Sequence, residues 1–301
     1  GRQLAEYELI VFLEADDLML PNKLNRQAAF LQLNPSLGYI HSGWQALDQE
    51  GQLLKTVEPW KYAPELNLET WLQQKPMAFG AIMFRRLWLD RVGGLDPQLL
   101  QSHDVDLLLR LSLAGCQGAW LYAPTLGYRQ HQTSTIHRNV STQAKSVLAV
   151  LDKLFARPDL PNSLRQDKTR TYFYTLLWLG WHAMVNGDEA TAVSTLQQSL
   201  ELAPKLYNLA PEHTVVEWLF HFLNWERENG RANSLADTIW PIFQEVARDG
   251  NSSAYRLHVV RSVAHLSVCP GLGAEQRGAD SRINHELVGA GLAALRPKAV
   301  R

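Results

Sequence analysis

The chain has 301 residues, of which 46% are hydrophobic and 20% charged, an ordinary composition for a globular protein long enough for two domains. The formal net charge is −1 and basic runs are missing, which argues against nucleic-acid binding. Two distant cysteines, Cys116 and Cys269, fit a reducing compartment without a disulfide framework. No apolar run approaches the roughly 18–20 residues of a membrane span. We therefore expect a cytoplasmic protein, at most peripheral at the inner membrane face.

The first predicted element is a buried strand over residues 8–13, and it ends in Glu14, Asp16 and Asp17. Carboxylates this close repel one another unless they are solvated or face a cation. A solvated loop and a cation site both remain open from this stretch alone. Because the chain enters a buried strand almost at once and has no initiator methionine, we expect a piece of a longer protein whose upstream strands are absent.

Strands and helices alternate through the rest of the first part of the chain. This pattern predicts an α/β sheet layered by helices. The expected elements are a helix over 23–33 ended by Asn34-Pro35, a strand over 37–47, a strand over 78–84, a short helix over 85–95 stopped by Gly93-Gly94, a helix over 104–115 and a strand over 119–131.

Residues 141–269 are predicted to form an α-helical domain similar to tetratricopeptide repeats. Small residues at Gly180, Ala192 and Ser199 would let two helices approach closely, and Pro204 would end the second helix. Since one such hairpin cannot bury its own faces, we expect it to pack on helices within 212–230 and 232–250. Residues 270–301 are Gly/Ala/Arg-rich and are expected to be a poorly ordered tail.

Three blocks of the first part resemble family 2 glycosyltransferases. They are "AEYELIVFLEADDLMLPNKLNRQAAFLQLNP", "VGGLDPQLLQSHDVDLLLRLSLAG" and "YRQHQTSTI", in the order that the family shows. The resemblance covers residues 1–137 and implies the later half of a GT-A-type (nucleotide-diphospho-sugar transferase) catalytic domain, a mixed sheet with flanking helices. The family's earlier half, which grips the nucleotide base, has no counterpart, so we expect this piece alone to be inactive.

The same resemblance implies roles for five residues. Asp16 would be the direct ligand of Mn²⁺ or Mg²⁺, a hard cation that offsets the charge of a departing diphosphate. Glu14 occupies the family's first aspartate position and would contact the nucleotide-sugar donor. Asp104 would be the base that takes the proton of the acceptor hydroxyl. His131 would reach the metal or the diphosphate, and Arg129 would neutralise phosphate. Direct displacement of this kind inverts the anomeric configuration.

The implied partners are a nucleotide-diphosphate sugar and a glycan, lipid-linked or protein acceptor, with a possible protein partner for the helical region. The chain departs from the family pattern at Glu14, an aspartate in most members, and at His103, where a glutamate is usual. Both departures favour the rival hypothesis of a degenerate domain that serves as a helical-repeat interaction module.

Interpretations without a role in sugar transfer also remain open for several of these residues. Asp104 could be the N-cap of its helix, and Arg110 could pair with a nearby acid. His103-Asp104 could also be the metal pair of an all-helical HD-type phosphohydrolase, although the strand context opposes this. A further open question is whether Trp44, Trp60 and Trp71 line a sugar site or belong to the core.

Overall fold

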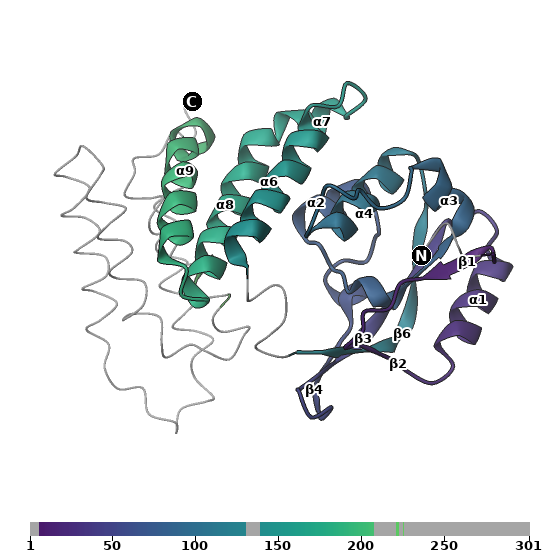
Figure 1. Ribbon diagram of the computed structural model, residues 1–301. Helices are drawn as coiled ribbons and strands as arrows, with labels where there is room; N and C mark the ends of the chain where they lie inside the picture. Colours follow the sequence, from purple (N-terminus) through teal and green to yellow (C-terminus); the bar gives the residue numbers. More distant parts are fainter. Residues whose placement is uncertain (1–5, 131–138, 208–220, 223–224, 226–301) are drawn as a thin grey trace, which may run out of the picture. The chain divides into compact units, whose positions relative to one another are not determined.

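The structure is a computed structural model that describes residues 6–130, 139–207, 221, 222 and 225 (Figure 1). A six-stranded mixed sheet forms its first part, in the order β1-β5-β3-β6-β2 with β4 paired to β3. The β3–β6 pair is parallel and the other pairs are antiparallel. The strands are β1 (Leu9–Val11), β2 (Leu18–Met19), β3 (Tyr39–Leu47), β4 (Leu53–Val57), β5 (Ile82–Arg85) and β6 (Gly118–Arg129).

Helices cover both faces of this sheet, which confirms the predicted mixed α/β class. Helix α1 (Lys23–Leu33) packs through Leu31 against Ile40 of β3 and Met83 of β5. The opposite face carries a larger apolar cluster, to which Tyr39 and Phe84 belong. That cluster is covered by α2 (Leu68–Gln73) and α4 (His103–Leu113), with α3 (Arg86–Arg91) following β5 and two 3-10 turns, η2 (Pro59–Lys61) and η3 (Phe79–Ala81), in the connections.

The link between β1 and β2 determines where the acidic residues lie. β1 is at one edge of the sheet and β2 at the other, so the intervening residues cross the sheet. Phe12 stacks on Phe79 of η3, with ring centroids 4.8 Å apart. Glu14, Asp16 and Asp17 are therefore carried past η3 toward the end of β6, with which β2 pairs.

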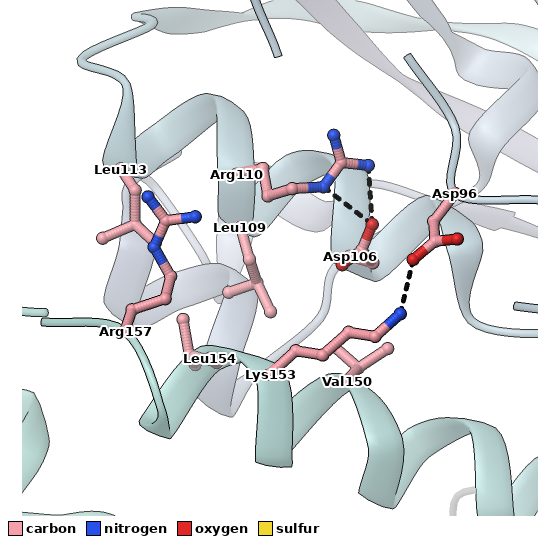
Figure 2. Close-up of a pocket in the computed structure, with 9 residues that line it drawn as sticks. All are labelled: Asp96, Asp106, Leu109, Arg110, Leu113, Val150, Lys153, Leu154 and Arg157. Carbon is pink, nitrogen blue, oxygen red and sulfur yellow. Dashed lines mark hydrogen bonds and ion pairs between the residues drawn. The ribbon is translucent and has the colours of Figure 1, made fainter. Parts of the chain in front are cut away.

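Helix α6 (Val140–Phe155) is the next described element after β6, and it joins the core of the sheet part. Its residues Val150 and Leu154 belong to the same apolar cluster as Leu107 and Leu109 of α4. A cavity of about 220 Å³ lies along this contact (Figure 2). The charged residues that line the cavity are paired: Lys153 binds Asp96 and Arg110 binds Asp106, and Arg157 binds Asp159.

Beyond α6 lie α7 (Asn162–Gln166), α8 (Lys168–Val185) and α9 (Glu189–Tyr207). α8 and α9 form a tight hairpin whose turn has Gly187 at φ 75°. Gly180 permits the close approach that the sequence predicts, because a Cβ there would lie 2.7 Å from Leu196. The tetratricopeptide type stays a prediction. The expected neighbours over 212–250 and the tail lie outside the described residues, apart from three isolated positions.

The structure differs from the sequence prediction mainly in its short elements. The predicted helix over 23–33 is confirmed at both ends, whereas the expected strand over 78–84 begins as the 3-10 turn η3. β2, β4 and α2 had not been predicted. Helix α9 continues to Tyr207, so Pro204 does not end it as expected. Among the residues that the structure describes, no helix has the length and apolar character that a membrane crossing requires.

Candidate active site

The first part of the site is the turn that follows β1. The backbone N–H of Asp17 donates to the carbonyl of Glu14 (3.2 Å), which folds Glu14, Asp16 and Asp17 into one tight turn. Glu14 is exposed, Asp16 is half-buried and Asp17 is buried. The Asp17 carboxylate accepts a hydrogen bond from the backbone N–H of Arg129 (3.1 Å). Asp17 thus ties the acidic turn to the end of β6.

Burial affects the protonation of this turn. It raises the pKa of Asp17 to about 6, opposed by the hydrogen bond from the Arg129 backbone and reinforced by the charges of Glu14 and Asp16. Burial and like charges make a carboxyl group hard to ionise, and a cation bound beside it stabilises its ionised form. The local electrostatics therefore suit a bound positive charge.

The second part of the site is the first turn of α4. The N-cap of α4 is Ser102, which has φ 59° and makes no side-chain capping bond. Asp104 lies two positions later, is half-buried, and accepts a hydrogen bond from the backbone N–H of Val105 (2.8 Å). The N-cap interpretation of Asp104 is therefore wrong. The mixed sheet beneath α4 also contradicts the all-helical HD-type phosphohydrolase.

Ring contacts and electrostatic interactions place the two parts near each other: Phe79 stacks on Phe12 (4.8 Å between ring centroids) and lies edge-on to His103 (6.1 Å). Although the Glu14 side chain reaches solvent, neighbouring protein atoms desolvate it in part, and this is the largest cause of its raised pKa. The negative charges of Asp16 and of Asp104 raise the pKa further, while His103 lowers it. Charges influence one another in this way only at short range, because water and salt screen them over about 10 Å. The structure therefore brings the acidic turn and the start of α4 to one place.

Tyr128 interacts with both parts of the site, and no role had been predicted for it. Burial raises the pKa of its phenol to about 12, and four surrounding carboxylates add to this shift. They are those of Glu14, Asp17, Asp16 and Asp104. The "YRQH" block contained the only sequence signal for Tyr128, since it placed this residue next to Arg129.

Both arginines considered from the sequence make structural contacts. Arg129 donates from Nε to the carbonyl of Asp16 (3.1 Å) and from Nη1 to that of Gln49 (2.7 Å), so it joins the acidic turn to the β3–β4 turn. A phosphate contact by Arg129 stays a prediction. Arg110 donates to the carboxylate of Asp106 (2.6 and 2.8 Å) and to the carbonyls of the Val92–Gly94 turn. The pairing interpretation of Arg110 is confirmed.

The residues present are compatible with a divalent ion that is held jointly by protein carboxylates and substrate phosphates. Within residues 6–130 and 139–207, no group of three or more His, Cys, Asp or Glu side chains is arranged to hold a metal ion. His131, the predicted partner of Asp16, lies outside the described residues. Mg²⁺ is usually held by one or two carboxylates together with substrate phosphates. Asp16, with Glu14 near it, provides such a donor set.

The three tryptophans considered for sugar binding are placed differently. Trp71 is 1% exposed and donates to the hydroxyl of Tyr39 (3.1 Å), so it belongs to the core. Trp60 is half-buried and makes an edge contact with Tyr122. Trp44 is also half-buried and packs, together with Tyr128, on a small apolar cluster. Of the three, Trp44 therefore borders the candidate site.

Comparison with known proteins gives a partial match to a sugar-transferring enzyme. No protein-family profile matches the sequence. A stretch of 107 residues is 25% identical to the uncharacterized glycosyltransferase MJ1057 of Methanocaldococcus jannaschii and covers 36% of this chain and 37% of that protein. The chain thus spans little more than a third of the length of the curated relative it matches.

Solved structures of S. aureus TarS are also similar in part. A crystal structure of TarS 1–349 shares 13% identity with a TM-score of 0.47, covering 67% of this chain and 58% of that one. TarS 1–349 in complex with UDP-GlcNAc gives 12% identity and a TM-score of 0.44, covering 67% and 60%.

Proposed function

We propose that residues 1–137 belong to the catalytic domain of an inverting glycosyltransferase of the family 2, GT-A type, which moves a sugar from a nucleotide-diphosphate sugar to a hydroxyl acceptor. The observation that carries this proposal is the proximity of the acidic turn to the start of α4: Phe79 contacts both Phe12 and His103, and carboxylates of both parts act on Tyr128. Transfer of a sugar requires one group that handles a leaving diphosphate and a second that accepts a proton. The two acidic parts supply these separately. The partial similarity to a glycosyltransferase supports the same class.

In the proposed reaction, the acceptor oxygen attacks the anomeric carbon and the bond from that carbon to the diphosphate breaks. Asp104 takes the proton that the acceptor hydroxyl loses. Asp104 is suited to this because it is half-buried at the helix start and its Oδ1 already has a backbone donor, which orients the carboxyl group. Since attack and departure occur on opposite faces, the configuration inverts.

Asp16 would hold Mn²⁺ or Mg²⁺ together with the donor diphosphate, and Glu14 would contact the donor. When bound, this ion would neutralise the negative charge that develops on the leaving group. Asp17 acts indirectly, since its bond to the Arg129 backbone fixes the turn that presents Asp16. Arg129 reinforces the same turn through the Asp16 carbonyl. Its contact with a donor phosphate is part of the proposal.

The decisive experiment is calorimetric titration of manganese and a panel of nucleotide-diphosphate sugars into the wild type and Asp16→Ala. We expect saturable, metal-dependent binding that Asp16→Ala abolishes. Asp90→Ala serves as the control, because Asp90 is an exposed carboxylate on α3 that pairs with Arg86. Binding that is the same in wild type and Asp16→Ala would remove the proposed metal site. Binding is the chosen readout because it tests the metal site directly and needs no known acceptor.

The alternative is a degenerate glycosyltransferase domain that serves as an interaction module. Glu14 and His103 favour it, because both depart from the residue types that the resembling family uses. The tight α8–α9 hairpin is the part that would contact a protein partner. A cytoplasmic location, at most peripheral at the inner membrane face, belongs to both proposals. The alternative predicts no nucleotide-sugar binding by the wild type, so the same titration separates the two.

A further inference from the structure

An aromatic pair borders the acidic residues and has no role in the proposed reaction so far. Trp44 on β3 and Tyr128 on β6 lie on neighbouring parallel strands, where Trp44 is in register with Leu126 and Ala46 with Tyr128. Residues two apart on a strand face the same side, so both rings stand on one face of the sheet. Both also pack on the cluster of Ala78, Ala81 and Leu126. We call Trp44 and Tyr128 the aromatic patch.

The aromatic patch is continuous with the acidic turn. The backbone of Arg129, next to Tyr128, is hydrogen-bonded to Asp17. Gly80 lies between Leu126, on which the aromatic patch packs, and Asp17. A Cβ at Gly80 would lie 2.9 Å from Leu126 and 3.6 Å from the Asp17 carboxylate. Tyr128 also interacts electrostatically with Asp17 and Asp16, so the aromatic patch lies beside the carboxylates of the acidic turn.

This combination matches the chemistry of a pyranose ring. A sugar ring has an apolar face of C–H groups, which stacks on an aromatic ring, and a rim of hydroxyls that donate to carboxylates. A serine or threonine side chain of a protein acceptor has no apolar face of this size. An acyl chain would bury against the rings but would have no donors for the carboxylates.

We propose that the aromatic patch is the binding site for the sugar ring of a carbohydrate acceptor, so that the acceptor is a glycan rather than a protein side chain or a lipid. This rests on the proposed function. The donor is anchored through its diphosphate near Asp16, whereas the acceptor has no phosphate to hold and must be oriented by other contacts. Tyr128 is near both Asp16 and Asp104. A ring stacked on the patch would therefore present its hydroxyl between the leaving group and the base.

The test uses the full chain on an immobilised panel of mono- and disaccharides, serine- and threonine-containing peptides and phospholipid vesicles. We expect the wild type to be retained by saccharides only. Trp44→Leu should weaken this retention about tenfold or more through loss of stacking, whereas Trp44→Phe, which keeps a ring, should retain most of it. Trp88→Leu is the matched control, because Trp88 is a half-buried tryptophan on α3 that lies against Gly38 and Cys116.

The nucleotide-sugar titration is run on the same variants, so that the two proposals fail separately. Normal donor binding in Trp44→Leu together with reduced saccharide retention supports the carbohydrate subsite. Donor binding combined with retention by peptides or vesicles instead of saccharides overturns it, as does equal saccharide retention in Trp44→Leu and Trp88→Leu. Wild type that binds no saccharide also overturns it. If Trp44→Leu does not fold, Tyr128→Phe and Tyr128→Leu are compared instead. Tyr128→Leu, which removes the ring, should reduce saccharide retention more than Tyr128→Phe, which removes only the hydroxyl.

Discussion

At the scale of single residues, Asp104 offers a direct test of whether the two acidic parts meet. Its charge contributes to the raised pKa of Glu14, after burial and after Asp16. Asp104→Asn removes this charge and keeps the shape of the side chain, so we expect the pKa of Glu14 to fall toward its ordinary value. Carboxyl-detected NMR titration measures the shift. Asp90→Asn on α3 should leave Glu14 unchanged, and an unchanged Glu14 in Asp104→Asn would contradict the convergence.

The same substitution has a kinetic consequence in any form of the protein that transfers sugar. Asp104→Asn should lower the transfer rate by about 10²-fold or more, because it removes the proton acceptor, while nucleotide-sugar binding stays near normal. Equal transfer rates would exclude Asp104 as the base.

Lys23 is a buried lysine whose charge should lower the free energy of unfolding. It is 1% exposed, and its ammonium donates to the hydroxyl of Thr125 (3.1 Å), which also contacts that of Ser42 (2.6 Å). Burial lowers the pKa of Lys23 to about 8. Lys23→Met removes a buried charge and leaves Thr125 and Ser42 paired. We expect it to raise the free energy of unfolding by about 1–3 kcal/mol at neutral pH.

The destabilisation by Lys23 should depend on pH, because the folded and unfolded chains bind its proton differently. The unfolded chain holds the Lys23 proton up to its ordinary pKa of 10.5, whereas the folded protein releases it near 8. The destabilising effect is therefore full below pH 8 and declines between about 8 and 10.5. Urea unfolding of wild type and Lys23→Met should give a difference that is large near pH 7 and small near pH 10. A constant difference across this range would show that the Lys23 charge is not the cause.

Residues of the site differ in how far the sequence could place them. The resemblance to known transferases singles out Asp16 and Asp104 from the sequence, because these residues lie in blocks with a recognisable order; their roles stay predictions. Tyr128 and Lys23 could not be assigned in this way. Lys23 opens a helix and would ordinarily be solvated there, but in the fold it is buried and its ammonium donates to Thr125 of β6, distant in sequence. Such burial depends on tertiary contacts that no local pattern records.

At the scale of elements, the α8–α9 hairpin depends on a glycine for packing. Alanine normally stabilises a helix interior by about 1 kcal/mol relative to glycine. A Cβ at Gly180 would meet Leu196 at 2.7 Å and Thr195 at 3.2 Å. We therefore expect Gly180→Ala to lower the free energy of unfolding by about 1–3 kcal/mol, the opposite of the propensity effect. Thermal and urea unfolding measure this change.

A double-mutant cycle separates the clash from other effects of the substitution. Leu196→Ala makes room for the added methyl group, so Gly180→Ala should be nearly neutral or stabilising in that background. If Gly180→Ala is equally destabilising with and without Leu196, the two helices are not in contact through this pair.

Elements with local signals were predicted well, and those that depend on the sheet were not. Helix α1 was predicted with its observed ends because Pro21-Asn22 and Asn34-Pro35 mark them. η3 had been predicted as part of a strand, because an apolar run does not reveal that the crossing chain stacks Phe12 on Phe79. α2 had a missed signal: Asn67 accepts from the N–H of Thr70 (2.9 Å), a standard N-cap.

At the scale of the whole molecule, α6 links the sheet part to the helices that follow. The sequence division at residues 137–141 stays a prediction, but the core does not stop there, since α6 contributes to the cluster that α4 occupies. Periodicity showed that α6 has an apolar face without showing what it covers. Leucines on α4 and α6 are chemically alike, so their pairing is a property of the folded chain alone.

This shared core predicts that α4 and α6 unfold together. Leu154 on α6 is 4% exposed and lines the cavity next to Leu109 (Figure 2). Leu154→Ala should lower the free energy of unfolding by about 2–4 kcal/mol, through lost burial and an enlarged cavity. Native-state hydrogen exchange should show an equal loss of protection at the amides of α4 and of α6. Lys145→Ala, an exposed position on α6, is the control and should change neither. Loss of protection confined to α6 would mean that the start of α4, and with it Asp104, is held in place without the helical region.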